Sequence, residues 1–294
     1  AMGLIGSLVP LGGVAGPGIG GVLLARFDWH AVFFVNVPVC VAAAALGLVS
    51  LGGVSLMGGA QSGAQSGAQQ MFGLLRRPPF LWGLVAFLAS TTVGAGLYYL
   101  FPFDLSVVQR FTPATAGLLL LCVPLGMGAM GMLGGYLTDR YGARRFMLLG
   151  SGLLLAGLAL LALVLTRPTA PADVAWRLLV IGAGMGLFIG PNQTVLMSAG
   201  PREMMAAASA LANLSARVGS VLGPLVVGLL WAVWPGVARQ MVAGVVALIA
   251  LAALTLVAAI VALGSAPKRP VEAATALRPA APQGAREGQL AARS

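Results

Sequence analysis

Apolar residues run along this chain in stretches of about 20, separated by short polar segments. A helix rises about 1.5 Å per residue, so a stretch of this length crosses the ~30 Å hydrocarbon core of a bilayer. The pattern predicts eight membrane-spanning helices, over residues 3–25, 31–52, 80–103, 114–138, 146–166, 174–198, 205–233 and 238–263. The sequence therefore predicts an all-α membrane protein.

Polar segments divide these stretches into unequal groups. Residues 53–79 contain the repeat AQSGAQSGAQ, whose composition predicts a flexible cytoplasmic linker between residues 1–52 and a six-helix unit at 80–263. Residues 264–294 hold five of the seventeen basic residues among Ala, Pro and Gly, which predicts a disordered basic cytoplasmic tail. Because the first apolar stretch begins at residue 3 without a basic leader, we expect no signal peptide and expect further helices upstream.

The charge composition agrees with a membrane protein. Charged residues make up 8% of the chain and hydrophobic residues 59%, whereas about 25% of a typical soluble domain is charged. A large soluble helical protein would need far more charged surface. We attribute the net charge of +10 to topology and to anionic lipid, and we expect the lipid bilayer rather than nucleic acid as its partner.

The distribution of Arg and Lys predicts the orientation of the helices. With a cytoplasmic linker, eleven basic residues lie on the cytoplasmic side and five on the outer side, with Arg217 inside a span. The tail supplies five of the eleven. The predicted outer ends also carry Trp29, Trp176, Trp231 and Trp234. Both patterns favour a multi-pass protein of the cell (plasma or inner) membrane with a cytoplasmic linker and C-terminus.

Two adjacent rows of small residues run along the first stretch: Gly12, Gly16 and Gly20, and beside them Gly13, Pro17 and Gly21. Such rows let another helix approach closely, and Pro17 removes one backbone hydrogen bond. Together with Gly3, the pattern resembles the antiporter motif of the fifth helix in drug:proton antiporters of the major facilitator superfamily. The resemblance implies a bend that seals the path between the two halves of the transporter.

A second motif, GYLTDRYGARR at 135–145, combines a helix end, a turn and a basic cluster. Its positions are Gly135, Asp139, Arg140, Gly142, Arg144 and Arg145. The residues alone indicate a tight turn at Gly142, and a helix dipole disfavours Asp139 unless it faces an arginine or another helix's N-terminus. The motif resembles the superfamily's signature loop between helices eight and nine, which implies a conformational latch.

The chain also repeats itself between the first and seventh stretches. Shifted by 207 residues, Gly12, Gly16, Pro17 and Gly21 align with Gly219, Gly223, Pro224 and Gly228, while Gly20 aligns with Val227. Transporters built from two halves produce such repeats. With the resemblance, this predicts a facilitator-superfamily helical bundle in which the eight stretches are helices 5 to 12 of an expected twelve. Residues 1–52 are then the last two helices of the first half, and 80–263 the second half.

Polar residues inside apolar stretches are costly, so each is a candidate for function. The substrate or coupling candidates are Arg217, Asn213, Asn192, Gln193, Asp104, Thr91 and Tyr98. The resemblance implies that helices 7, 8, 10 and 11 face a central cavity. Arg217 either couples protons there or braces backbone carbonyls, and Asn192 and Gln193 either line the cavity or bond to neighbouring helices. Asp104 departs from the family, where an aromatic or apolar residue is usual.

The chain carries no pattern for an enzyme, a cofactor or a metal. It has one histidine, no Cys/His metal spacing and no Walker motif, and we expect Cys40 and Cys122 to be buried thiols. A proton gradient is the remaining energy source. We predict a monomer that exports drugs or amphipathic or cationic small molecules in exchange for protons, by alternating access. A transporter of a metabolite or nutrient, and a non-transporting truncated membrane protein or scaffold, stay open as alternatives.

Overall fold

The computed structural model describes residues 60–164 and 169–265, together with scattered helical positions between 34 and 45. Apart from those positions, the predicted spans 3–25 and 31–52 lie outside the described residues, as does the predicted tail beyond 265. Within the two long described ranges the elements are α3 (Ala60–Leu75), α4 (Pro78–Phe103), η1 (Asp104–Val108), α5 (Pro113–Tyr141), α6 (Ala143–Ala162), α7 (Pro171–Ser198), η2 (Arg202–Met204), α8 (Met205–Val233) and α9 (Val237–Ser265).

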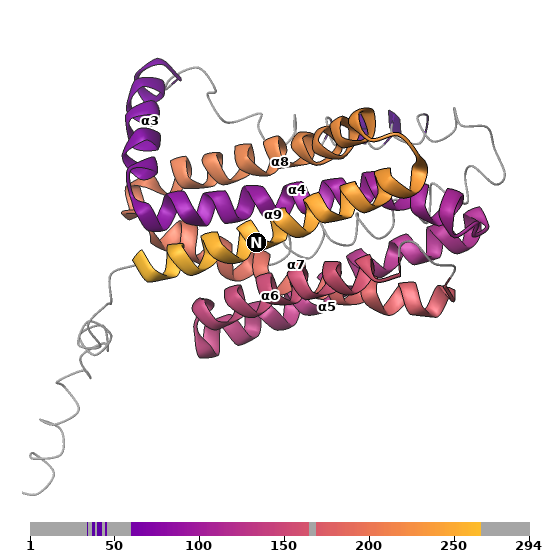
Figure 1. Cartoon of the computed structure of the whole chain (residues 1–294). Coiled ribbons are helices and arrows are strands. Elements are labelled where there is room, and N and C mark those ends of the chain that lie inside the picture. The colour runs from indigo at the N-terminus through magenta and orange to yellow at the C-terminus, as the bar shows by residue number, and fades with distance from the viewer. Residues whose placement is uncertain are drawn as a thin grey trace, which may run out of the picture.

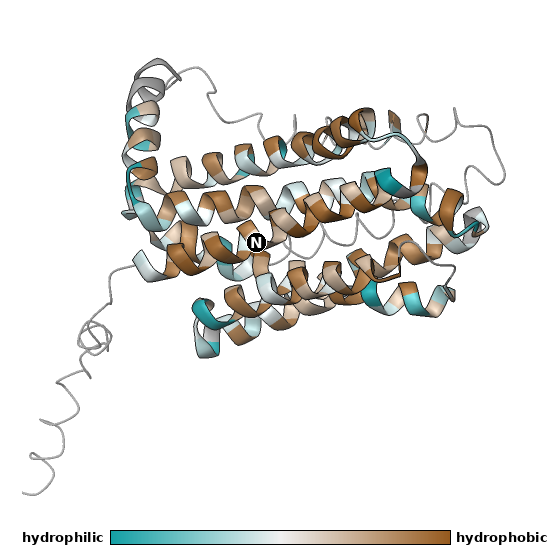
Figure 2. Ribbon diagram, viewed as in Figure 1, coloured by the Kyte–Doolittle hydropathy of each residue, from teal (hydrophilic) through white to brown (hydrophobic). Residues whose placement is uncertain are grey.

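Helices α4 to α9 correspond to the six spans predicted over residues 80–263, with every boundary within four residues of the prediction. All six are long and apolar enough to cross a membrane. Figure 2 shows apolar residues along their lengths and polar residues mainly near their ends. The described part of the chain is thus the predicted all-α membrane unit.

Local sequence signals fix where several of these helices begin and end. Pro78, Pro113 and Pro171 open α4, α5 and α7, where the missing N–H of proline leaves no hydrogen bond unmade. Gly142 separates α5 from α6 with a φ of 86°, a backbone conformation that glycine adopts readily. The tight turn predicted at Gly142 is confirmed.

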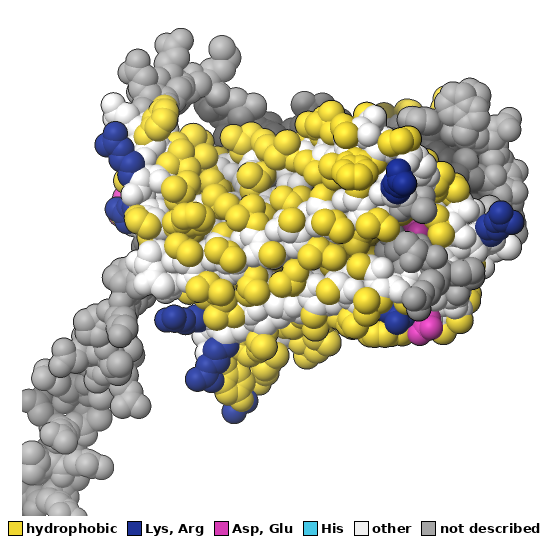
Figure 3. Space-filling model, viewed as in Figure 1, with side chains coloured by type: hydrophobic (Ala, Val, Ile, Leu, Met, Phe, Trp, Pro, Cys, Tyr) yellow, Lys and Arg dark blue, Asp and Glu magenta, His cyan; other side chains and the backbone are white. Residues whose placement is uncertain are grey.

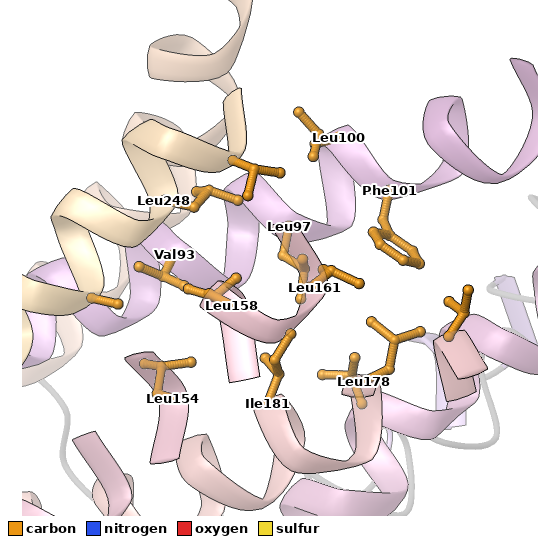
Figure 4. Close-up of a cluster of buried hydrophobic side chains, with 14 of the residues drawn as sticks. Val93, Leu97, Leu100, Phe101, Leu154, Leu158, Leu161, Leu178, Ile181 and Leu248 are labelled. Atoms are coloured by element: carbon orange, nitrogen blue, oxygen red, sulfur yellow. The ribbon is translucent and has the colours of Figure 1, made fainter. Parts of the chain in front are cut away.

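The six long helices form two layers. Helices α4, α8 and α9 pack together in one layer, and α5, α6 and α7 in the other (Figure 1). The layers meet where α6 contacts α9 and α4 contacts α7. Between them lies a core cluster, shown in Figure 4, of Val93, Leu97, Leu100, Phe101, Leu154, Leu158, Leu161, Leu178, Ile181 and Leu248, each at most 2% exposed.

Contacts between connecting segments define two ends of the bundle. At the end that we call the basic end, Arg77 Nη1 donates to Ala199 O at 3.0 Å, joining the start of α4 to the end of α7. At the opposite end, Thr169 N donates to Gln109 Oε1 at 3.1 Å. The basic end carries Arg76, Arg77, Arg140, Arg144, Arg145 and Arg202, and the opposite end carries Arg110, Arg177 and Arg239. In Figure 3 the visible face between the two ends is largely apolar.

Residues 60–75, within the predicted linker 53–79, form helix α3, so this part of the segment has regular structure. Gly and Ser residues dominate the composition of the repeat, whereas the residues farther along the segment form an apolar face. Leu74 is fully buried, and Met71 and Leu75 pack against the same cluster. Figure 1 shows α3 standing across the ends of the long helices. The domain boundaries themselves remain a prediction.

Candidate functional site

Arg217 lies near the midpoint of the 29-residue helix α8, and its side chain is exposed. Its guanidinium makes no hydrogen bond or ion pair with any residue that the structure describes. With Val218, Val221 and Leu222 it lines an open hollow of about 310 Å³. The structure therefore provides no described carbonyl that Arg217 braces, and leaves its five donors for water, a ligand or another segment.

Asn213 lies one turn before Arg217 on the same exposed face of α8, as the sequence predicted. Its Nδ2 donates to Ser209 O at 2.9 Å, and Ser209 Oγ approaches Met197 Sδ at 3.5 Å. The amide oxygen of Asn213 is left as a free acceptor within the described structure. The face around this polar pair is apolar, with exposed Leu214 and Val221. Polar groups at mid-membrane depth require water or a partner, so this face is the candidate site.

Thr91 and Tyr98 contribute less to that face. Thr91 Oγ1 lies 3.0 Å from Phe87 O and 2.9 Å from Leu88 O on its own helix α4. It also lies where a side chain on Gly219 of α8 would go, so it is a packing residue of the α4–α8 contact. Tyr98 is exposed near the end of α4.

Asn192 is fully buried and does not reach the hollow. It lies on α7 opposite Gly83 of α4, with its Oδ1 3.7 Å from the position that a Gly83 Cβ would take. Neither Oδ1 nor Nδ2 has a hydrogen-bond partner among the described residues. Gln193, the next residue, is half-buried. Asn192 therefore occupies the α4–α7 contact without the interhelical hydrogen bond that was one of its two predicted roles.

Asp104 is buried in η1, a π-helical turn that continues α4 directly after Pro102 and Phe103. The backbone N–H of Gln109 donates to Asp104 O at 2.9 Å, and its side chain hydrogen-bonds the Asp104 carboxyl. The sequence reasoning missed Gln109, because the five-residue spacing of a π turn follows no apolar pattern. π turns within helices often occur at functional sites.

The loop motif lies at the basic end, between α5 and α6. Arg140 Nη1 donates to Tyr136 Oη at 3.5 Å, and its guanidinium lies 5.6 Å from the Tyr141 ring centroid. Arg144 and Arg145 are exposed, and a Cβ on Gly135 would meet nothing within 4 Å of the described structure. The side chain of Asp139 lies outside the described residues, and so does the whole antiporter motif from Gly3 to Gly21.

An aromatic cluster at the opposite end was not predicted. The rings of Tyr99, Phe103 and Trp231 lie within 5.8 Å of one another, centroid to centroid. Trp231 Nε1 donates to Gln240 O at 3.1 Å, and Gln240 Nε2 donates to Trp231 O at 3.0 Å. These contacts join α4, α8 and α9 at this end of the bundle. Within the described ranges no group of three His, Cys, Asp or Glu side chains could hold a metal ion.

Comparison with curated proteins identifies transporters. The chain is 33% identical over 159 residues to the uncharacterized transporter YebQ of Escherichia coli (strain K12), covering 53% of this chain and 34% of YebQ. It is 24% identical over 249 residues to the riboflavin transporter RibZ of Clostridioides difficile (strain 630), covering 69% and 54%. It is 26% identical over 284 residues to the multidrug resistance protein Stp of Mycobacterium tuberculosis, covering 80% and 52%. The chain thus spans about a third to about half the length of these relatives.

A solved structure shares the fold. It is a bacterial homologue of the human lysosomal transporter Spinster, in an inward-facing and unoccupied conformation, with a TM-score of 0.51 and 17% sequence identity. The match covers 86% of this chain and 65% of that one. The likeness confirms the predicted fold class.

A sequence profile of one family matches residues 1–224 and also residues 106–291. Together the two matches extend over nearly the whole chain, including both motifs that resemble this family. The chain belongs to the Major Facilitator Superfamily.

Proposed function

We propose that this protein exports amphipathic small molecules in exchange for protons, by alternating access between the two faces of the membrane. The observation that carries the proposal is the Arg217–Asn213 face of α8, where an exposed guanidinium without a described partner lies beside an open apolar hollow near the middle of the helix. Arginine keeps its proton in proteins. A permanent charge at this depth is supported by water in a transport path, or by a carboxylate that charges and discharges.

The direction of transport and the coupling ion rest on two further observations. The small-residue pattern from Gly3 to Gly21 resembles the motif of antiporting members, and Stp is named a multidrug resistance protein. At the basic end, Arg140, Arg144 and Arg145 are exposed, which leaves them free for contact with another part of the transporter. We propose that this loop is the conformational latch and that the basic end and the C-terminus are cytoplasmic.

The lining of the hollow bears on the substrate. Val218, Val221 and Leu222 give it an apolar wall, and the exposed Arg217 puts one positive charge beside it. A guanidinium repels a cation, so a cationic substrate requires a carboxylate nearby. An amphipathic neutral molecule meets no such cost. A metabolite substrate is the second candidate, because RibZ is named a riboflavin transporter.

Efflux from living cells tests the proposal. The complete gene product is expressed in a bacterium without major efflux pumps, and the cells are loaded with ethidium or with riboflavin. We expect energised cells to lose at least one of these fluorescent probes faster than cells with an empty vector, and an uncoupler to abolish the difference. The same assay on Arg217→Met tests the candidate face, with Leu229→Met, at an exposed position of α8 outside the hollow, as its control. Efflux that continues unchanged with the uncoupler would contradict proton coupling.

A further inference from the structure

Asp104 differs from the other acidic residues whose side chains the structure describes. Its side chain is 2% exposed, whereas Asp173 and Glu203 are exposed. It lies near one end of the membrane-spanning segment Pro78–Val108. Buried carboxyl groups within membrane segments are rare and commonly mark the paths of ions.

The Asp104 carboxyl has one described hydrogen-bond partner, and one of its two oxygens has none among the described residues. It hydrogen-bonds the Gln109 side chain. Its Oδ1 is buried without a hydrogen-bond partner among the described residues. The ion pair that the described structure contains, between Arg177 and Asp173, does not involve it. Burying an ionised carboxylate without a cation costs far more free energy in such a place than burying a neutral carboxyl group.

The elements that pack against η1 bring few other titratable groups near it. Helices α4 and α5 contact η1, and in their nearer parts they carry Tyr98, Tyr99 and Cys122. Arg110 follows η1 directly but is exposed. The described charged residues of α5 lie in its last turn, at the basic end. None of these described groups brings a cation to the Asp104 carboxyl, and a proton is the simplest cation that can neutralise it.

Gln109 connects Asp104 to another part of the bundle. Its Oε1 accepts from Thr169 N at 3.1 Å and from Thr169 Oγ1 at 3.3 Å, and its Nε2 donates to Val164 O at 3.5 Å. Val164 and Thr169 lie in the connection between α6 and α7. A carboxylate accepts a stronger hydrogen bond than a neutral carboxyl group. Protonation of Asp104 therefore changes how firmly Gln109 is held between η1 and that connection.

We propose that Asp104 takes up and releases a proton during the transport cycle, and that Gln109 transmits this change to the α6–α7 connection. A hydronium ion in the water at the opposite end of the bundle gives the proton to a carboxylate oxygen of Asp104: one O–H bond of the hydronium ion breaks, the O–H bond of the carboxylic acid forms, and a water molecule is left. The inference rests on the proposed proton-coupled function. The residue at which the sequence departs from the family is then a coupling group of this chain.

Infrared spectroscopy tests the protonation directly. Difference spectra of the complete protein in lipid are recorded as the pH is changed, and the C=O stretch of protonated carboxyl groups is followed. We expect a titrating band that Asp104→Asn removes, Asp104→Glu moves and Gln109→Leu shifts. Asp173→Asn, at an exposed acid of the same end, should leave it in place. A wild-type spectrum without such a band, or a band that Asp104→Asn or Asp104→Glu leaves unchanged, would overturn the proposal.

Transport in proteoliposomes separates this inference from the proposed function. Ethidium and riboflavin are the probes, and a pH gradient is the energy source. Asp104→Asn should lose gradient-driven accumulation, Asp104→Glu should keep part of it, and Asp173→Asn should keep all. If the wild type accumulates a probe and Asp104→Asn does so equally well, the inference fails and the proposed function stands. If the wild type accumulates neither probe, the proposed function fails, and the infrared titration alone decides whether Asp104 binds a proton.

Discussion

At the residue scale, glycine controls how closely the helices approach. A Cβ on Gly223 of α8 would collide with the backbone of α4, at Gly96 N and at Thr92 O. Gly219 meets α4 in the same way, against Thr91 and Leu88 O. Helix contacts within lipid depend on close backbone packing, because lipid tails are as apolar as leucine. The internal repeat thus has a physical role in its second copy, where it lets α8 lie directly on α4.

We expect Gly223→Ala to destabilise the protein by about 1–3 kcal/mol, the usual cost of overpacking. The methyl group has to displace backbone atoms, which cannot move aside as a flexible side chain can. Gly228→Ala is the matched control, because a Cβ at this position of the same helix meets nothing within 4 Å. Unfolding in detergent measures both variants. Equal unfolding midpoints for the two variants would contradict the packing.

Variants of Arg217 can distinguish a role in transport from a role in structure. Because its guanidinium has no partner in the described part of the chain, Arg217→Met should unfold at the same temperature as the wild type. It should still lose gradient-driven efflux of ethidium or riboflavin. Arg217→Lys keeps the charge without the planar fork and should retain part of the efflux. Variants that unfold early, yet transport normally once folded, would show that Arg217 is structural.

At the element scale, α3 belongs to the folded unit. Leu74 is fully buried, and its Cδ2 lies 2.8 Å from the position that a Gly200 Cβ would take. Gly200 precedes η2 and α8, so α3 lies against the connection between α7 and α8 at the basic end. Movements of the long helices that change this connection must also move α3.

Leu74→Ala should release α3 from the bundle. Truncating a fully buried leucine costs about 2–5 kcal/mol, and here the loss falls on one short helix. Phe72→Ala is the control, because Phe72 is 69% exposed on the same helix. Hydrogen exchange of residues 67–75, followed by mass spectrometry, should be fast in Leu74→Ala and slow in the wild type and in Phe72→Ala. Fast exchange in the wild type would show that this segment is a flexible linker and would contradict its docking on the bundle.

The sequence predicted the long helices well because membrane spans are long, apolar and marked by proline starts such as Pro113 and Pro171. It did not predict α3, because the apolar positions around Leu74 are few and the Gly and Ser residues dominate the composition. It also could not reveal η1, since a π turn uses the same kinds of residues as an α-helix.

The candidate site was predictable only in part. Arg217 and Asn213 share a face because they are four residues apart on a helix, and this follows from spacing alone. The burial of Asn192 and Asp104 does not follow from spacing, because α4 and α7 are apolar on all sides and their inward faces show no pattern. Which side of such a helix is buried depends on contacts between distant segments, such as Gly83 with Asn192.

At the scale of the whole molecule, the two ends of the bundle differ in charge. The basic end carries six of the arginines in the described ranges and the opposite end carries three, with Arg217 between the two ends. By the positive-inside rule this asymmetry supports the proposed cytoplasmic position of the basic end. The exposed side chains of α5 and α8, such as Met132 and Leu229, are mostly apolar between the ends. Such surfaces suit lipid or contact with further transmembrane helices.

Cysteine labelling tests this orientation. Gln69→Cys on α3 and Thr112→Cys before α5 place exposed thiols at the basic and opposite ends. Both are made in a background with Cys40 and Cys122 replaced by serine. In intact cells an impermeant maleimide should label Thr112→Cys, and it should reach Gln69→Cys only after the membrane is opened. The reverse pattern would invert the topology and place the latch motif outside.

The most direct test of the proposed function is proton exchange by the purified, complete protein in liposomes. A pH-sensitive dye is enclosed in the vesicles, an acidic interior is imposed, and ethidium or riboflavin is added outside. We expect the probe to accumulate inside while protons leave, with both fluxes absent from vesicles that carry Arg217→Met. Accumulation of a probe without proton release, or release that is independent of any probe, would contradict proton-coupled export.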